Sequence, residues 1–300
     1  MEPIAILLVL ASAVLHATWN MIAKKSGASL AFYATLGTVG VMWSCFVQFF
    51  TPLRFFGLPP AFHAWLAGMV ASEFLYATGL RLSYRALDMS TAYPMMRALP
   101  LPLLAVITAV FSFGKPIGAL GALGMAMVFA GCLLTPLKRF SDFQLSRYLD
   151  HSFLYIVIVA LGTTGYTLCD SQAQAVMRAA APDVARPMVS LSYYSFRAMT
   201  LTSVLWVAVL CGRKSRAEAA ELWRHRPWMP LLAGCCSSLT YVLVLTAMNF
   251  ATNVSYVQAF RQVGLIFGLL ESFFILHERC TLPKVAGVAL ILAGLAVSVA

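Results

Sequence analysis

The chain has 300 residues, of which 61% are hydrophobic and only 11% are charged, and its mean hydropathy is +0.82. Soluble domains carry about 45–50% apolar and about 25% charged residues, so the polar side chains here are too few to coat a water-soluble fold. The composition excludes a soluble domain and a disordered chain, and it predicts an all-α integral membrane protein.

Ten apolar runs, each long enough to cross about 30 Å of hydrocarbon, follow one another along the chain. They cover residues 4–22, 31–50, 62–82, 89–111, 116–136, 152–174, 188–210, 229–248, 252–275 and 282–299. The first run is interpreted as a retained span and not as a secretory signal, because it starts with Glu2 and no basic residue. The longest connections, 137–151 and 211–228, are short, polar and basic, so no soluble domain is expected.

The net charge of +10 is explained by topology signals and not by nucleic-acid binding, because no basic helix or RNA-binding strand is expected beside the loop cations. When the loop lysines and arginines are assigned to alternate sides of the membrane, fourteen fall on one side. Four fall on the other: Arg54, Lys115, Arg178 and Arg186. The positive-inside rule then puts both termini outside. The seven cysteines include no C-x-x-C pair and are predicted to be small buried hydrophobic residues, with no metal site.

An internal repeat relates the two halves of the chain. A shift of 163 residues puts the fourth and fifth runs on the ninth and tenth without a gap, matching Tyr93 with Tyr256, Lys115 with Glu278, Gly124 with Gly287, and Gly131 with Gly294. A shift of 150 residues puts the first run on the sixth, matching His16 with Tyr166, Asn20 with Asp170, and Lys24 with Gln174. Glycines seven residues apart lie on one helix face, so the fifth and tenth helices are expected to pack closely against neighbours.

The repeat predicts two five-helix modules, residues 1–137 and 152–300, joined by a loop at 138–151. Because five is odd, the second module must insert upside down relative to the first. Inverted repeats of this kind are the usual construction of alternating-access transporters, whose substrate site lies near the middle of the membrane.

The strings "LHATWNMIAKKSG", "SYYSFR" and "SYVQAFRQVG…LHERCTLPKVAGVALILAGLAV" resemble the EamA family of the drug/metabolite transporter superfamily, over almost the full length. In that family each repeat closes with an apolar-Gly-Glu turn and a glycine-containing last helix. Glu278 fits this pattern, whereas Lys115 follows Gly114 where the first repeat would have a glutamate. The resemblance implies a transporter with both termini in the cytoplasm, opposite to the charge count.

Ionisable residues at membrane depth are the best candidates for a site, because each costs about 2.5–3.5 kcal/mol to insert and normally faces a cavity or a partner. Polar stripes run along span one (Ser12, His16, Asn20) and span six (Thr163, Thr167, Asp170, Ser171, Gln174). They predict either a water-accessible seam or two packed helices joined by hydrogen bonds.

Arginines recur on spans four, seven and nine. Arg97 precedes Pro100 and Pro102, which remove backbone donors and predict a broken helix. If the arginines converge, their guanidinium groups suit a carboxylate, phosphate or phosphonate. In the alternative, Arg197 snorkels to the interface while Arg97 and Arg261 neutralise Glu73 and Asp170. Glu271 lies on another face of its span.

The predicted site has two parts. Substrate binding is assigned to Asn20, Trp19, Tyr76, Tyr93, Arg97, Gln174, Arg197, Tyr241, Gln258, Arg261 and Gln262, and proton coupling to Glu73, Asp170 and His16. Proton coupling requires a carboxyl or imidazole group that is desolvated in one state and open to water in the other.

The sequence predicts a secondary transporter of a small anionic or zwitterionic metabolite, such as an amino acid, carboxylate or phosphonate, coupled to protons or working by exchange. Multidrug cation efflux and a lipid-phosphate flippase are the alternatives. No nucleotide-binding motif and no catalytic motif is present, so neither ATP-driven pumping, nor an enzyme, nor a cofactor is expected. The expected partners are the substrate and the lipid bilayer, and the protein is expected to be a monomer or a homodimer. The expected location is the plasma membrane, which in bacteria is the inner membrane.

Overall fold

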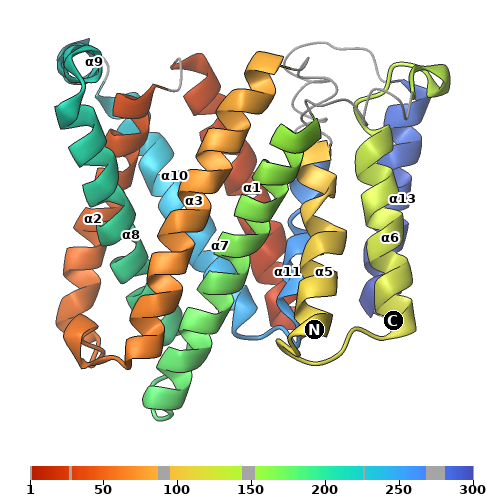
Figure 1. The fold of residues 1–300 in the computed structure, drawn as a ribbon, viewed down its shortest axis with the longest axis horizontal. Helices are drawn as coiled ribbons and strands as arrows, with labels where there is room; N and C mark the ends of the chain where they lie inside the picture. Colours follow the sequence, from red (N-terminus) through yellow and green to blue (C-terminus); the bar gives the residue numbers. More distant parts are fainter. Residues whose placement is uncertain are drawn as a thin grey trace. The chain divides into compact units, whose positions relative to one another are not determined.

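The structure is a computed structural model that describes residues 2–26, 29–86, 95–143, 153–225, 227–267 and 281–299. Every regular element in these ranges is helical (Figure 1). The α-helices are α1 (Pro3–Lys25), α2 (Leu30–Phe50), α3 (Pro60–Ala86), α5 (Pro100–Val110), α6 (Ala119–Leu134), α7 (Phe153–Ala180), α8 (Arg186–Cys211), α9 (Arg213–His225), α10 (Trp228–Met248), α11 (Val254–Phe260) and α13 (Leu282–Val299), with short 3-10 turns η1 (Phe55–Gly57) and η2 (Phe140–Asp142). The chain is all-α over the described ranges, as its composition predicts.

Five helices, α2, α7, α8, α10 and α13, are long and apolar enough to cross a membrane. The segments Pro3–Trp19, Met95–Val110 and Ala119–Leu134 are shorter apolar helices. These helices identify the chain as a membrane protein.

Two sequence interpretations are corrected by the structure. The connection 211–228 contains the basic helix α9, although no basic helix was expected. Hydropathy misses it because its apolar residues occupy only one narrow face. Of the cysteines that were predicted to be buried, Cys132 and Cys169 are, whereas Cys45, Cys211 and Cys235 are exposed on helix surfaces.

The helices form two compact units. The first unit contains Met1–Ile6, Ala67–Asp170 and Phe250–Ala300, and the second contains Leu7–Leu66 and Ser171–Asn249. Each unit therefore combines residues from both predicted modules, 1–137 and 152–300, and the modules themselves remain a prediction from the repeat.

In the first unit, α6 and α13 lie side by side (Figure 1). A Cβ atom added to Gly131 would lie 2.7 Å from the carbonyl oxygen of Gly287, and one added to Gly294 would lie 2.6 Å from the carbonyl oxygen of Gly124. The backbones touch at both ends of the contact, and the pairing runs antiparallel. The close packing that the glycine spacing predicts is confirmed.

Glycines also bring α3 and α7 together in the first unit. A Cβ on Gly79 would lie 2.8 Å from the backbone nitrogen of Val159, and one on Gly162 would lie 2.5 Å from that of Tyr76. Helices in lipid have no hydrophobic driving force for association. Small residues at such crossings let the backbones approach, and close van der Waals contact then holds the helices together. This crossing fixes where the side chains beside it point.

In the second unit, α2 packs between α8 and α10. A Cβ on Gly234 of α10 would lie 2.6 Å from the carbonyl oxygen of Leu36. In the turn after α2, the ring of Phe55 contacts two others. Its centroid lies 6.1 Å from that of Phe62 and 5.4 Å from that of Phe196. These contacts hold the start of α3 against α8.

We expect Gly131→Ala to destabilise the protein by about 1–3 kcal/mol, because the new methyl group must push α13 away from α6. Gly118→Ala, at the N-cap of the same helix, has nothing within 4 Å of the added atom, so it should lose only the cap preference of glycine over alanine, about 0.5–1 kcal/mol. Thermal unfolding of both variants in detergent measures the difference. Equal melting temperatures would contradict the packing described for α6.

Candidate functional site

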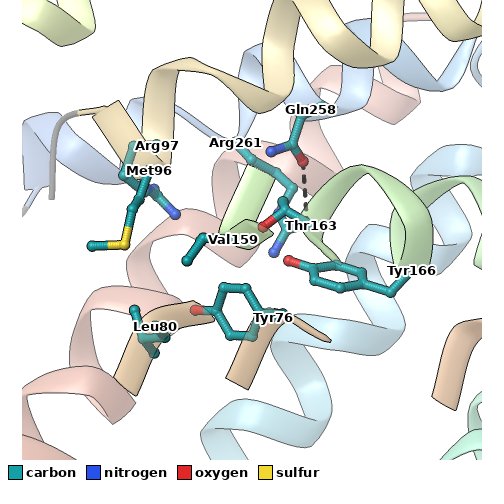
Figure 2. Close-up of a pocket in the computed structure, with 9 residues that line it drawn as sticks. All are labelled: Tyr76, Leu80, Met96, Arg97, Val159, Thr163, Tyr166, Gln258 and Arg261. Carbon is teal, nitrogen blue, oxygen red and sulfur yellow. Dashed lines mark hydrogen bonds between the residues drawn. The ribbon is translucent and has the colours of Figure 1, made fainter. Parts of the chain in front are cut away.

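The first unit contains a cavity of about 70 Å³. Its nine lining residues come from four segments, and Figure 2 shows them: Tyr76, Leu80, Met96, Arg97, Val159, Thr163, Tyr166, Gln258 and Arg261. Since a single water needs about 10–15 Å³ of such a cavity, the space holds several waters or one compact polar group.

Two tyrosines form one wall of the cavity. Tyr76 on α3 and Tyr166 on α7 meet edge to face, with ring centroids 5.9 Å apart and planes at 90°. Gly162 makes this possible, because its missing side chain lets α7 touch the backbone at Tyr76. Figure 2 shows both rings on the side of the cavity opposite Arg97 and Gln258.

Arg97 enters the cavity just before an interruption in the hydrogen-bond pattern of a helix. Residues 95–98 are helical, Leu99 is a turn residue, and α5 begins at Pro100. Pro100 and Pro102 have no backbone N–H, so the carbonyls of Met96 and Ala98 lack their usual helical donors. The loss of donors that these prolines predict is confirmed, but the helix is not broken. Leu99 has helical dihedral angles, and its amide donates to Met95 O at 2.9 Å.

A second interruption lies at Arg261 and Gln262, where α11 ends. The backbone amide of Gln262 donates to Ala259 O at 3.0 Å in place of Gln258 O, and the side-chain Nε2 of Gln262 donates to Gln258 O at 3.1 Å. The next amide bonds also span three residues, from Gly264 to Arg261 and from Leu265 to Gln262. In the tightened turn the backbone amide of Gln262 no longer bonds Gln258 O, and the side-chain amide of Gln262 takes its place as the donor.

The two interruptions occupy matching positions. The shift of 163 residues that puts Gly124 on Gly287 also puts Leu99 on Gln262. They are near each other in space, since a Cβ on Gly264 would lie 3.6 Å from Nη2 of Arg97. Each interruption therefore brings an arginine to the same cavity.

The cavity is cationic. Arg261 donates to Oε1 of Gln258 at 3.4 Å, a weak bond within one turn. The Nε atom of Arg97 is buried, and no described residue accepts a hydrogen bond from it. The nine lining residues include no carboxylate. Two guanidinium groups in one lining suit an anion, whose oxygens can accept their hydrogen bonds.

Four of the predicted substrate-binding residues line the cavity together, namely Tyr76, Arg97, Gln258 and Arg261, and Gln262 is fully buried beside them. Sequence reasoning did not select Tyr166 as a site residue, although it is one helical turn from Thr163 on the polar stripe of α7. The apolar lining residues Leu80, Met96 and Val159 gave no signal, because they resemble any other membrane-helix residue.

The predicted proton carriers of the first unit lie near the cavity but outside its lining. Glu73 is half-buried on α3, three residues before Tyr76, and Asp170 is fully buried on α7, four residues after Tyr166. Each is therefore one helical turn from a tyrosine of the cavity wall. Tyr93 and Glu271 lie outside the described residues, and so does the side chain of Asn20.

The other predicted residues belong to the second unit. Arg197 is buried, and its guanidinium carbon lies 3.9 Å from the ring centroid of Tyr241. Such a cation–π contact stabilises an arginine removed from water by about 2 kcal/mol. Nε1 of Trp19 donates to Nδ1 of His16 at 3.2 Å. Each of these pairs contains two residues that sequence reasoning chose separately.

Gln174 lies in a buried polar network of the second unit. Its Oε1 accepts hydrogen bonds from Ser190 Oγ at 3.0 Å and from Asn249 Nδ2 at 2.8 Å. Arg178 Nη1 donates to Asn249 Oδ1, so Asn249 connects α7, α8 and the end of α10. The network satisfies several polar groups that would otherwise be buried without partners.

Asn249→Ala should therefore destabilise the protein by about 1–3 kcal/mol, since buried partners lose their hydrogen bonds. Thr18→Ala, which removes one hydroxyl bond within α1, serves as the control and should change stability by less than about 0.5 kcal/mol. Thermal unfolding in detergent measures both. A neutral Asn249→Ala variant would show that water replaces the network.

Among the described residues, no group of three or more His, Cys, Asp or Glu side chains is placed to hold a metal ion.

Comparisons with known proteins show that the fold occurs in solved structures. No protein family model matches the sequence, and no curated protein matches it. Twenty-eight chains of solved structures match. One, described only as "Crystal structure of protein", covers 98% of this chain and 98% of its own, with a TM-score of 0.67 and 15% sequence identity. At that identity the likeness extends to the fold alone.

Proposed function

We propose that this protein is a secondary active transporter that moves a small anionic or zwitterionic metabolite across the plasma membrane by alternating access. The observation that carries the proposal is the pair of matched helix interruptions, each of which brings an arginine to one cavity. Interrupted helices at corresponding positions of two repeats are the best structural pointer to a transporter substrate site. The proposed family is the EamA branch of the drug/metabolite transporters.

The proposed architecture is two inverted five-helix repeats with ten spans, and the glycine contacts support the inversion. Under the repeat shift, Gly124 becomes Gly287 and Gly131 becomes Gly294. The two observed contacts, Gly124 with Gly294 and Gly131 with Gly287, then exchange with each other. Contacts that exchange in this way are the signature of a two-fold axis. Because α6 and α13 are antiparallel, that axis is perpendicular to them, as an axis in the membrane plane would be.

The substrate class follows from the donors. Two guanidinium groups present planar pairs of N–H donors that match a carboxylate, phosphate or phosphonate. Thr163 and the tyrosine hydroxyls add neutral donors and acceptors along the same walls. The cavity volume of about 70 Å³ suits the charged group of a metabolite better than a large apolar drug. Multidrug cation efflux and lipid-phosphate flipping are the alternatives that experiment must exclude.

Energy is proposed to come from an ion gradient or from exchange. Glu73 and Asp170 are near the cavity wall, and His16 is on the polar stripe of α1. A carboxyl group that is buried in one state and open to water in the other can take up and release a proton during the cycle. Glu73 is the first choice because it lies on the same helix as Tyr76.

The substrate class is tested by thermal unfolding of the purified protein with inorganic phosphate, methylphosphonate, succinate or glutamate, and with ethidium as a cationic probe. We expect at least one anion to raise the melting temperature. Arg97→Gln and Arg261→Gln should each abolish that rise, since the loss of one charged hydrogen bond weakens binding by about 1.5–3 kcal/mol.

Arg54→Gln is the control, because this exposed arginine belongs to the second unit and bonds only the Gln48 carbonyl among the described residues. It should leave the anion effect unchanged. Stabilisation by ethidium alone, lost in Glu73→Gln, would replace the anion transporter with a cation exporter.

The coupling residue is tested in proteoliposomes with whichever of these anions stabilises the protein. An imposed pH gradient should drive uptake by the native protein, and Glu73→Gln should abolish that drive while leaving the melting temperature and substrate exchange intact. Asp183→Asn, an exposed carboxylate between α7 and α8, should behave like the native protein. Unchanged pH-driven uptake in Glu73→Gln would remove Glu73 from the coupling mechanism.

A further inference from the structure

Helix α9 joins α8 and α10 in the second unit. Only Gly212 separates it from α8, and its sequence is RKSRAEAAELWRH. With 13 residues and about 1.5 Å of rise per residue, it is too short and too polar to cross a bilayer. In Figure 1, α9 is seen almost end on, while α2 and α8 run along the page. The helix therefore lies across the end of α8, in the orientation of a helix on a membrane surface.

The apolar face of α9 is already occupied by its own unit. Ala219 is buried in a cluster with Ala31, Ala34 and Val209. Leu222, one turn further, packs against the cluster that contains Phe32. Because these contacts anchor the helix, its remaining faces are presented outward in a fixed orientation.

The outward faces divide by charge. At about 100° per residue, Arg213, Arg216, Trp223 and Arg224 fall on one flank of the helix, while Glu218 and Glu221 fall on the other. The three arginines and Trp223 are all exposed. Lys214 lies on the acidic flank. We call the first group, Arg213, Arg216, Trp223 and Arg224, the arginine flank.

We infer that the arginine flank binds the phosphate headgroups of anionic phospholipids in the membrane that the protein spans. Guanidinium groups match phosphate oxygens with paired hydrogen bonds. Tryptophan is enriched at the level of lipid headgroups. Trp223 and Trp228 are exposed, by 45% and 60%. A cluster of cations beside the end of a membrane helix is typical of a surface that attracts anionic lipid.

This site is distinct from the cavity of the first unit, so it does not depend on the transported substrate. Each arginine near an anionic surface strengthens binding by about fivefold. Loss of three should weaken the interaction by about 100-fold. The flank carries no buried side chain of the unit's core, so substitutions there should leave the fold intact.

The test is a titration of the purified full-length protein in neutral detergent with phosphatidylglycerol or phosphatidylcholine, followed by thermal unfolding. Phosphatidylglycerol should raise the melting temperature, and phosphatidylcholine should not. The triple variant Arg213→Gln, Arg216→Gln, Arg224→Gln should lose this rise. Any rise that inorganic phosphate causes through the cavity should be the same in the triple variant as in the native protein, because the flank binds the headgroup together with its lipid.

A matched pair separates the arginine flank from general charge. Arg216→Gln and Lys214→Gln each remove one positive charge from α9, but from opposite flanks. Arg216→Gln should shift the midpoint of the phosphatidylglycerol titration about fivefold, and Lys214→Gln should shift it less than twofold. Equal shifts, a full rise in the triple variant, or an equal rise with phosphatidylcholine would overturn the proposal. If the triple variant does not fold, the two single variants decide alone.

Discussion

The close approach of helix backbones at glycine is the constraint on which this structure depends. In lipid, helices gain little from burying apolar side chains, so contact between backbones must hold them together. Gly131 and Gly287 do this for α6 and α13, and Gly79 and Gly162 do it for α3 and α7. The second crossing also sets Tyr76 against Tyr166, so the packing that stabilises the first unit builds one wall of its cavity.

The cavity joins this packing to charge. Interruptions of a helix free backbone groups from the regular hydrogen-bond pattern. Arg97 lies just before one interruption and Arg261 lies in the other, and an arginine is costly to expose to lipid. At Leu99 the cause is the missing N–H of proline. At Arg261 it is the side chain of Gln262, which takes over a bond that the backbone gives up. Two different local causes thus act at positions that the 163-residue shift matches.

The sequence predicts most of the helices because length and hydropathy determine a membrane span. It misses α9, whose inner face of Ala219 and Leu222 is too narrow to raise hydropathy. It finds Arg97 and Arg261 because charge at membrane depth is rare. It does not find Tyr166 or the turn at Gln262, since a tyrosine or glutamine in a helix gives no local sign of the contacts it makes. That Arg97 and Arg261 share a cavity is a property of tertiary packing between distant segments.

The central claim is that Arg97 and Arg261 act on one anion, and a double-mutant cycle tests it most directly. Methylphosphonate binding to the native protein, Arg97→Gln, Arg261→Gln and the double variant would be measured by calorimetry. The account predicts that the double variant loses clearly less binding free energy than the two single losses combined, with a coupling of about 0.5–3 kcal/mol. Losses that add within about 0.3–0.5 kcal/mol, or no binding to the native protein, would contradict it.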